Sequence, residues 1–342
     1  MTSNRLRTPV CTLLGCDLPI LLAGMGGVAR SELVAAVAQA GGYGILGMVR
    51  ETPQLIAQEV AAVRARTDRP FAVNLIPAAT DPALLDAELG TCLDLGVPAI
   101  CFFWDVVPAA VARAKAGGCL VLHQVGSLDA ARAAEAAGAD VLIVQGVEAG
   151  GHVHGTVSAL VLVEQVVRAV TLPVIASGGF ATGASLIAAL ALGAQGIHCG
   201  TAFLATVESF AHDEHKARVL AAMAEDTVHT DIYALNWPPS TPVRVIRNSV
   251  INGLGPNLMG HRPDLLPQEV IAAEDGRPLI RYSTDSPLRS TKGNLEAMAI
   301  YAGQSVSLID TLPTAAGRVE AIIDEAWAAL DRQAALIKGG AA

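Results

Sequence analysis

The sequence predicts an α/β protein, a TIM (β/α)8 barrel with a smaller lid domain inserted between the last strand and the last helix. The first observation is a set of short apolar runs without alternation, at residues 141–144, 173–176 and 196–199. Such runs are typical of parallel strands that are buried on both faces. The second observation is that alanine-rich segments of helical length separate these runs, at 158–170 and 182–192. The third is that glycines follow each run, as they do after the strands of βα units.

Five earlier runs extend the same pattern towards the N-terminus. They lie at residues 18–23, 44–48, 70–75, 99–103 and 120–124. Helices are expected at 31–40, with Ser31 as the capping residue, and at 52–66. The strands then number about eight, which is the number that closes a barrel. An open doubly wound sheet is the alternative, but no GxGxxG motif follows the first strand and nothing indicates a change in strand order.

The chain changes character after residue 207. Helices are expected at 208–226, 294–303 and 315–330, and an alternating β-branched stretch lies at 242–246. We therefore expect residues 1–207 and 305–342 to form the barrel, and residues 208–304 to form the lid. A lid of this kind lies over the catalytic face and excludes water from it. Its residues 230–233 and 237–239 are expected to select the substrate.

The composition indicates a large core rather than a disordered chain, because 52% of the residues are hydrophobic and only 16% are charged. A formal charge of −9 argues against nucleic acid or an anionic membrane as the main partner. Residues 169–207 carry no charged side chain, which raises the question of a membrane span. Pro173 and six glycines interrupt this stretch, so we interpret it as the buried centre of a barrel.

The six cysteines show neither a CxxC pair nor the Cys/His spacing of a metal site. We therefore expect reduced, buried thiols and no bound metal. Asp17 and Pro19 interrupt the apolar region that a signal peptide would need, so a cytoplasmic location is expected. The sequence leaves the oligomeric state open, and a homo-oligomer is compatible with it.

Two glycine-containing turns, Gly178-Gly179 and Gly200-Thr201, follow the seventh and eighth expected strands and suggest a phosphate site. Glycine lets backbone N–H groups approach an anion without a Cβ in the way. A helix N-terminus at Thr182-Gly183 would add further donors. The alternative is a pair of tight βα turns without a ligand, which explains one such turn more easily than two in succession.

His152 is the candidate catalytic residue. It follows Gly150-Gly151 in the loop after the sixth strand, so it should face the mouth of the barrel. Imidazole titrates near neutral pH and can accept a proton from an acidic carbon. The alternative is a loop histidine without a role. Of its neighbours, we expect His154 to be a bystander, Glu148 to be structural, and His198 to contribute its backbone rather than its ring.

Several of these motifs resemble one known family, the nitronate monooxygenases, formerly called 2-nitropropane dioxygenases. The strongest resemblance lies in Gln145-Gly146-Val147-Glu148-Ala149-Gly150-Gly151-His152, Ala176-Ser177-Gly178-Gly179 and Gly200-Thr201. Further family positions are Gly24-Met25-Gly26-Gly27, Val73-Asn74-Leu75 and Tyr301-Ala302-Gly303-Gln304, so the resemblance spans almost the whole chain. The Glu-Ala-Gly-Gly-His run is also shared with an NADH:quinone reductase branch and with flavin-dependent enoyl-acyl carrier protein reductases.

The resemblance implies an FMN-dependent barrel with a second, smaller domain, and it places the family's catalytic histidine at His152. FMN fits better than a dinucleotide, because its single terminal phosphate needs one cradle. The amides of Asn74 and Gln145 can both donate and accept hydrogen bonds, as the isoalloxazine edge requires. Without the family match, a turn-forming role would explain Asn74 as well. The residues expected to bind the cofactor are Gly24, Met25, Asn74, Gln145, Gly150, Gly151, Gly178, Gly179, Cys199, Gly200, Thr201 and Gln304.

The function expected from this resemblance is FMN-dependent oxidative denitrification of alkyl nitronates and nitroalkanes with molecular oxygen. One alternative is an FMN-dependent NADH:quinone or enoyl-thioester reductase of the same superfamily. An alternative of another class is a flavin-free barrel that binds a phosphate ligand. The sequence assigns no role to His123 or Gln124, which end the fifth expected strand.

Overall fold

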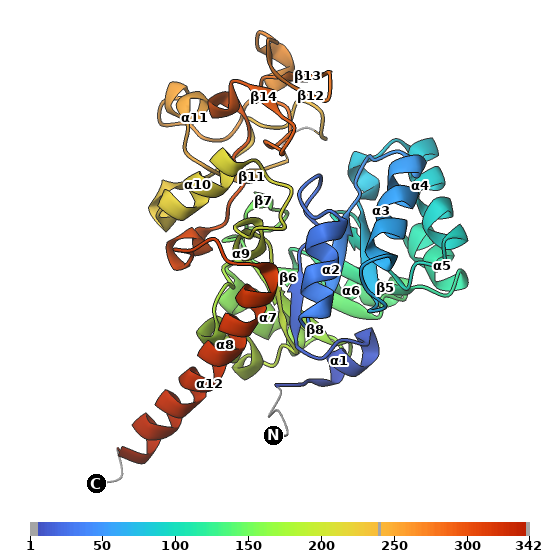
Figure 1. The fold of residues 1–342 in the computed structure, drawn as a ribbon, viewed down its shortest axis with the longest axis vertical. Coiled ribbons are helices and arrows are strands. Elements are labelled where there is room, and N and C mark those ends of the chain that lie inside the picture. Colours follow the sequence, from blue (N-terminus) through green and yellow to red (C-terminus); the bar gives the residue numbers. More distant parts are fainter. Residues whose placement is uncertain (1–5, 239–240, 340–342) are drawn as a thin grey trace.

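The computed structural model describes residues 6–238 and 241–339 and is built around eight parallel strands (Figure 1). These strands are β1 (Ile20–Leu22), β2 (Gly44–Gly47), β3 (Phe71–Leu75), β4 (Ala99–Phe103), β5 (Leu120–Val125), β6 (Val141–Gln145), β8 (Val174–Ser177) and β9 (Ile197–Cys199). Their order is β1-β9-β8-β6-β5-β4-β3-β2. The two ends of this order meet, because Leu22 N–H donates to Tyr43 O and Tyr43 N–H donates to Ile20 O, both at 2.9 Å. The predicted (β/α)8 barrel is therefore confirmed, and the open sheet is excluded.

Helices surround the barrel on its outer face (Figure 1). They are α2 (Ser31–Gln39), α3 (Pro53–Arg64), α4 (Pro82–Asp94), α5 (Pro108–Ala116), α6 (Leu128–Ala137), α7 (Ala159–Val167), α8 (Gly183–Ala191), α9 (Thr201–Leu204) and α12 (Ala315–Gly339). Thr52 caps α3 through its side chain, which accepts from Leu55 N–H. The expectation for Ser31 was wrong: it is the first helical residue of α2, and its N–H donates to the Glu59 carboxylate at 2.7 Å.

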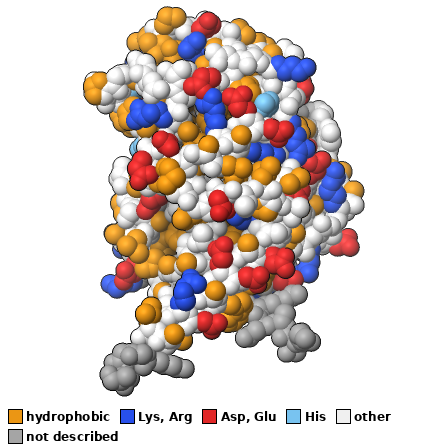
Figure 2. All heavy atoms as spheres, turned by 60° about the vertical axis from the view of Figure 1, so that its left-hand side comes forward, with side chains coloured by type: hydrophobic (Ala, Val, Ile, Leu, Met, Phe, Trp, Pro, Cys, Tyr) orange, Lys and Arg blue, Asp and Glu red, His pale blue; other side chains and the backbone are white. Residues whose placement is uncertain are grey.

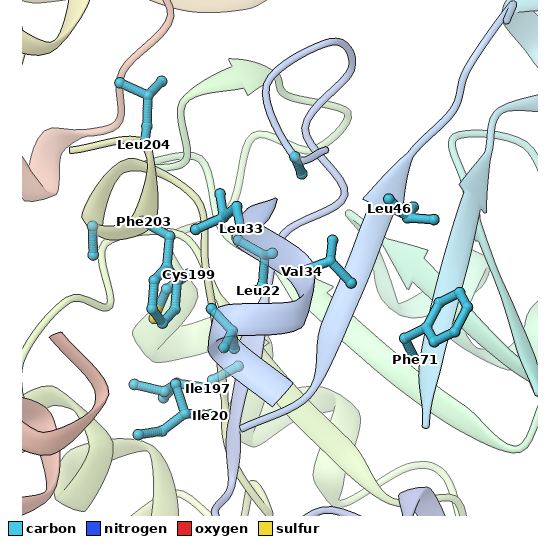
Figure 3. Close-up of a cluster of buried hydrophobic side chains, with 14 of the residues drawn as sticks. Ile20, Leu22, Leu33, Val34, Leu46, Phe71, Ile197, Cys199, Phe203 and Leu204 are labelled. Atoms are coloured by element: carbon cyan, nitrogen blue, oxygen red, sulfur yellow. The ribbon is translucent and has the colours of Figure 1, made fainter. Parts of the chain in front are cut away.

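The barrel interior and the layer between strands and helices form two apolar cores. The interior core joins inward side chains such as Tyr43, Ile143 and Ile175 to the helix α1 (Pro9–Leu14). The N–H of Val10 donates to Gln195 Oε1 at 2.9 Å, and Gln195 precedes β9. Helix α1 therefore covers the amino end of the barrel. The outer core lies between the strands and the surrounding helices (Figure 3).

A second group of elements lies beyond the carboxyl ends of the barrel strands (Figure 1). One small antiparallel sheet consists of β7 (Gly151–His152), β10 (Thr227–Thr230) and β11 (Val243–Ile246), and another of β12 (Val270–Glu274), β13 (Arg277–Ile280) and β14 (Lys292–Gly293). Helices α10 (Asp213–Ala221) and α11 (Ser249–Gly253) accompany them, with short 3-10 turns at Ala224–Asp226, Pro263–Leu265, Leu295–Ala297 and Gln304–Leu308. A further 3-10 turn, Pro77–Ala79, lies between β3 and α4 of the barrel. The group has its own apolar cluster, which includes Tyr233, Val245 and Ile251. The domain boundaries at residues 208 and 304 stay a prediction.

Two helices expected in this segment differ from the structure. The helix expected at 208–226 is limited to α10, followed by a 3-10 turn. The helix expected at 294–303 is wrong, because only Leu295–Ala297 form a 3-10 turn and Tyr301 pairs with Val245 in an antiparallel bridge. The apolar residues of this stretch are almost all buried and leave no polar stripe for a helix to expose: Ala297, Met298, Ala299, Ile300 and Ala302. Pro239, part of the expected substrate-selecting loop, lies outside the described residues.

No helix within residues 6–238 and 241–339 has the length and apolarity that crossing a membrane requires. The six cysteines are all buried and unpaired, as expected.

Candidate active site

A cavity of about 780 Å³ lies at the carboxyl ends of the barrel strands, beneath the second group of elements. The structure brings together at this cavity most of the residues predicted from the sequence: Gly24, Met25, Asn74, Gln145, Gly150, Gly151, His152, Gly178, Gly179, Gly200 and Thr201. Such clefts at the carboxyl face are where barrel proteins bind small molecules.

Two predicted cofactor residues do not reach the cavity. The Cys199 side chain points into the outer core beside Phe203 (Figure 3), because alternate residues of a strand face opposite sides. Gln304 is exposed, and its backbone N–H donates to Glu148 O at 3.0 Å. Its neighbour Gly303 lines the cavity instead.

The glycine loops have close backbone contacts that exclude side chains. Gly178 and Gly179 have φ angles of +91° and +83°, a region that other residues rarely adopt. A Cβ at Gly178 would lie 2.9 Å from Gly146 O, and a Cβ at Gly24 would lie 2.5 Å from Asn74 Cβ. The cavity is therefore bordered here by bare backbone, which is what a phosphate cradle needs.

The N-terminus of α8 does not complete that cradle, contrary to expectation. Thr182 and Ser185 form a reciprocal capping box at this end of the helix. The N–H of Gly183 donates to the Glu325 carboxylate at 2.8 Å. Since protein groups already satisfy these donors, an anion must rely on the loops at 178–180 and 200–201, which line the cavity.

His152 is held in the cavity wall by backbone pairing and by an amide. It forms β7, in which it lies opposite Val243 of β11. Gln145 Nε2 donates to His152 O at 3.0 Å, and Gln145 Oε1 accepts from His154 N–H at 3.4 Å. The side chain of Gln145 thus fixes the loop that carries His152.

The His152 side chain is half-buried, and its imidazole is neutral. Its Nε2 atom is buried without a hydrogen-bond partner in the structure. Burial, and then the charge of Arg50, lower the pKa of His152 from 6.5 to about 3. The ring stacks on Trp237, with centroids 3.7 Å apart, and Trp104 meets it edge-on at 6.2 Å. The site therefore contains an uncharged imidazole whose Nε2 is shielded from water and has no protein partner among the described residues.

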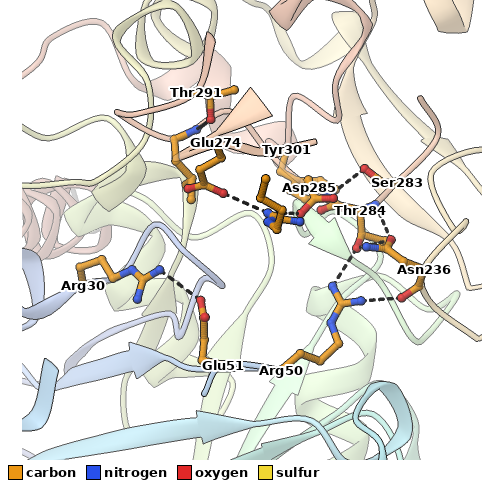
Figure 4. Close-up of polar contacts among 12 residues, drawn as sticks. Arg30, Arg50, Glu51, Asn236, Glu274, Ser283, Thr284, Asp285, Thr291 and Tyr301 are labelled. Carbon is orange, nitrogen blue, oxygen red and sulfur yellow. Dashed lines mark hydrogen bonds and ion pairs between the residues drawn. The ribbon is translucent and has the colours of Figure 1, made fainter. Parts of the chain in front are cut away.

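Arg50 is a cavity residue that the sequence analysis missed. It follows β2 with a φ of 59°, which is uncommon for a residue other than glycine. Its guanidinium carbon lies 5.3 Å from the Trp237 ring. Its Nη1 donates to Asn236 O at 2.5 Å and its Nη2 to Thr284 Oγ1 at 3.1 Å (Figure 4). The only sequence signal for Arg50 is a basic residue shortly after a strand. Its partner Asn236 lies 186 residues further along the chain, so the contact could not be predicted from the sequence.

Four further polar side chains lie in the cavity wall or close behind it. Gln124 lines the cavity, whereas His123 is fully buried beside it and bonds Gln124 O at 3.2 Å through Nδ1. The His198 ring also lines the cavity and bonds Ser177 Oγ at 2.9 Å, although only its backbone was expected to matter. Glu148 is structural, as expected, because its carboxylate accepts from Ala159 N–H at the start of α7.

The outer part of the cavity carries paired charges. Arg30 pairs with Glu51 at 3.1 Å, and Arg277 pairs with Glu274 at 3.0 Å and with Asp285 at 2.9 Å. Figure 4 shows this rim between the barrel loops and the β12–β13 hairpin. Within the described parts of the chain, no cluster of three or more His, Cys, Asp or Glu side chains could hold a metal ion.

Comparison with known proteins gives a consistent result. Residues 7–325 match the nitronate monooxygenase family. One relative, from Mycobacterium tuberculosis, is 33% identical to this chain, and the match covers 98% of this chain and 100% of the relative. It is named (3aS,4S,5R,7aS)-5-hydroxy-7a-methyl-1-oxo-octahydro-1H-indene-4-carboxyl-CoA dehydrogenase. FabK from Thermotoga maritima superposes with a TM-score of 0.82 at 32% identity, covering 96% of this chain and 99% of FabK. Nitroalkane oxidase from Streptomyces ansochromogenes superposes with a TM-score of 0.78 at 32% identity, and the match covers 94% of this chain and 99% of the oxidase.

Proposed function

Since the chain belongs to the nitronate monooxygenase family and is an oxidoreductase, we propose that it oxidises alkyl nitronates and nitroalkanes with molecular oxygen and a bound FMN. The observation that carries the proposal is the neutral His152, whose unpartnered Nε2 lies in the same cavity wall as the cation of Arg50. A neutral base beside a cation suits a substrate that loses a carbon-bound proton and gains charge on oxygen.

The cavity residues fit FMN. The bare backbone at Gly178-Gly179 and at Gly200 would hold the phosphate, because a Cβ there would be strained or would enter the cavity. Asn74 Nδ2 donates to Cys101 O at 3.0 Å, which directs its amide from β3 and leaves its oxygen as an acceptor. Gln124 is a second amide for the ring edge, since Gln145 is engaged with the His152 loop. Bound FMN supplies the electron acceptor for the oxidation.

His152 would act on the neutral nitroalkane alone. Its Nε2 accepts the proton from the carbon that bears the nitro group, and the C–H electron pair moves onto the nitro oxygens. A preformed nitronate has already lost this proton and needs no base. Gln145 is the positioning residue in this scheme, because it holds the backbone on both sides of Val153.

One experiment tests the proposal against both alternatives. The protein should purify yellow with non-covalent FMN and consume oxygen with ethylnitronate and with nitroethane. Rapid anaerobic bleaching by NADH, without activity on ethylnitronate, would assign it to the reductases instead. A colourless protein that FMN cannot reconstitute would point to a flavin-free barrel.

A second candidate substrate class is a thioester of coenzyme A. The observation that favours it is the charged rim, on which Arg30 and Arg277 flank the way from solvent to the apolar interior around Ile76, Phe103 and Trp237. Two similar proteins are named as a CoA dehydrogenase and as FabK. Titration with a series of acyl-CoA thioesters, followed by the flavin spectrum, would reveal this class by saturable changes that free coenzyme A does not produce.

The surface charges bear on whether nucleic acid could be a partner. On the face shown in Figure 2, acidic and basic side chains are interspersed, which does not favour a polyanion such as nucleic acid. A cytoplasmic location and a homo-oligomeric state stay predictions.

A further inference from the structure

Three arginines line the cavity, and they differ in their partners. Arg30 forms an ion pair with Glu51. Arg277 forms ion pairs with Glu274 and with Asp285, and all of these pairs are shorter than 4 Å. Among the described residues, Arg50 has no carboxylate within that distance. Arginine stays charged in proteins, so Arg50 brings to the cavity a cation that no direct ion pair in the described part of the chain holds.

The position of Arg50 is fixed from two sides. Its backbone adopts a φ of 59°, a conformation that costs energy outside glycine and is concentrated at functional sites. Asn236 O and Thr284 Oγ1 accept from its two terminal nitrogens. Guanidinium has five N–H donors, so these contacts orient the group and leave donors for a ligand.

Arg50 and His152 contact the same side chain. The guanidinium lies over the Trp237 ring at 5.3 Å, and the imidazole stacks on that ring at 3.7 Å. Arg50 and His152 thus both line the cavity and both pack against Trp237.

We propose that Arg50 binds the paired anionic oxygen atoms of the substrate while His152 faces the adjacent carbon. A guanidinium edge matches two coplanar oxygens, such as those of a nitronate or a carboxylate, through two parallel hydrogen bonds. When a nitroalkane is deprotonated, the proton goes to His152 and the C–H electron pair goes to the nitro oxygens, where Arg50 offsets the charge. Arg50 thus serves both substrate forms, and His152 serves only the neutral one.

The identity of the anion rests on the proposed function, but the anion site itself is tested without catalysis. Propionate has the planar, two-oxygen anion of ethylnitronate and does not react. Its binding to the purified holoprotein is measured by isothermal titration calorimetry, with neutral propionamide as the matched ligand. Arg50→Met should weaken propionate binding roughly 10- to 100-fold, as expected for loss of a charge-assisted bond, and should leave propionamide binding within about threefold. Arg50→Lys should recover part of the loss, because lysine keeps the charge but not the planar fork.

Thr284→Val is the control for a purely structural role. It removes one of the two contacts that orient Arg50 but keeps the guanidinium, so propionate binding should weaken by less than in Arg50→Met. An Arg50→Met protein with native melting temperature and native propionate affinity would overturn the proposal. So would a loss in Thr284→Val as large as that in Arg50→Met. If propionate binding depends on Arg50 but ethylnitronate is not oxidised, the anion site stands and the proposed function fails.

Discussion

The imidazole of His152 and the indole of Trp237 are stacked, with ring centroids 3.7 Å apart and planes inclined by 19°. His152 belongs to the loop after β6, whereas Trp237 belongs to the segment beyond the barrel. The contact therefore joins the barrel to that segment at the point where the proposed chemistry takes place. It also shields the imidazole from water, and this burial is the main reason for its low pKa.

His152→Asn should separate the two substrate forms. A positioned general base contributes roughly 10²- to 10⁴-fold, or about 3 to 5 kcal/mol of barrier. We expect that loss in kcat/KM with nitroethane and a much smaller one with ethylnitronate, both measured by oxygen consumption. Equal losses would mean that His152 positions the substrate, and unchanged rates would remove it from the mechanism.

Trp237→Leu should raise the pKa of His152 towards 6.5, because it admits water beside the ring. A protonated imidazole cannot accept a proton, so kcat/KM with nitroethane should then fall as the pH drops below about 6. In the native protein the pKa of about 3 keeps His152 neutral, so the fall of kcat/KM with nitroethane should begin only at much lower pH. The ethylnitronate profile serves as the control. An acid limb at the same pH in both proteins would contradict the assignment.

Gly179→Asp should release FMN and leave the barrel folded. The carboxylate would enter the proposed cradle and repel the phosphate, and the φ of +83° would strain the backbone. Gly118→Asp is a matched control, since Gly118 has a φ of +84° and no atom within 4 Å of its Cβ, and it precedes β5 at the opposite end of the barrel. Flavin content per chain should fall only in the first variant. Full occupancy in Gly179→Asp would place the phosphate elsewhere.

The stability of the fold should decrease from pH 7 to pH 5. Burial lowers the pKa of His198 to about 3 and the pKa values of His123 and His215 to about 4, whereas each returns to about 6.5 on unfolding. Between these values the unfolded chain binds more protons, so protonation favours unfolding as the pH falls. Each histidine should contribute roughly 2 kcal/mol at pH 5. Melting temperatures by calorimetry at the two pH values check this, and a flat profile would refute it.

The barrel could be predicted because its signal is local. A strand buried on both faces must be apolar throughout, and the glycines directly after β8 and β9 mark the loops that border the cavity. The place of His152 at the cavity could be predicted for the same reason, since its loop is a continuous motif. The direction in which a single side chain points could not be predicted from the motif. Cys199 faces the outer core, although the adjacent Gly200 lines the cavity.

The remainder of the site depends on contacts between distant parts of the chain. Arg50 meets Thr284 across 234 residues, and neither residue carries a motif. The helix expected at 294–303 failed because residues 297–300 are all buried and Tyr301 pairs with Val245, so the composition resembles a helix while the surroundings impose an extended path. Trp237 was assigned to a substrate-selecting loop, but its stacking on His152 could not be inferred from sequence alone.

Because β7 pairs with β11, the entry of a substrate into the cavity is coupled to the position of the His152 imidazole. Gly151 and His152 form one edge of the small sheet whose other strands are β11 and β10. If the segment beyond the barrel swings away to admit a substrate, it must either break this ladder or carry the imidazole with it. In both cases the base leaves its position while the site stands open. With such a motion, proton abstraction would be confined to the closed state, and the nitronate would form only where His152 and the rest of the site are assembled.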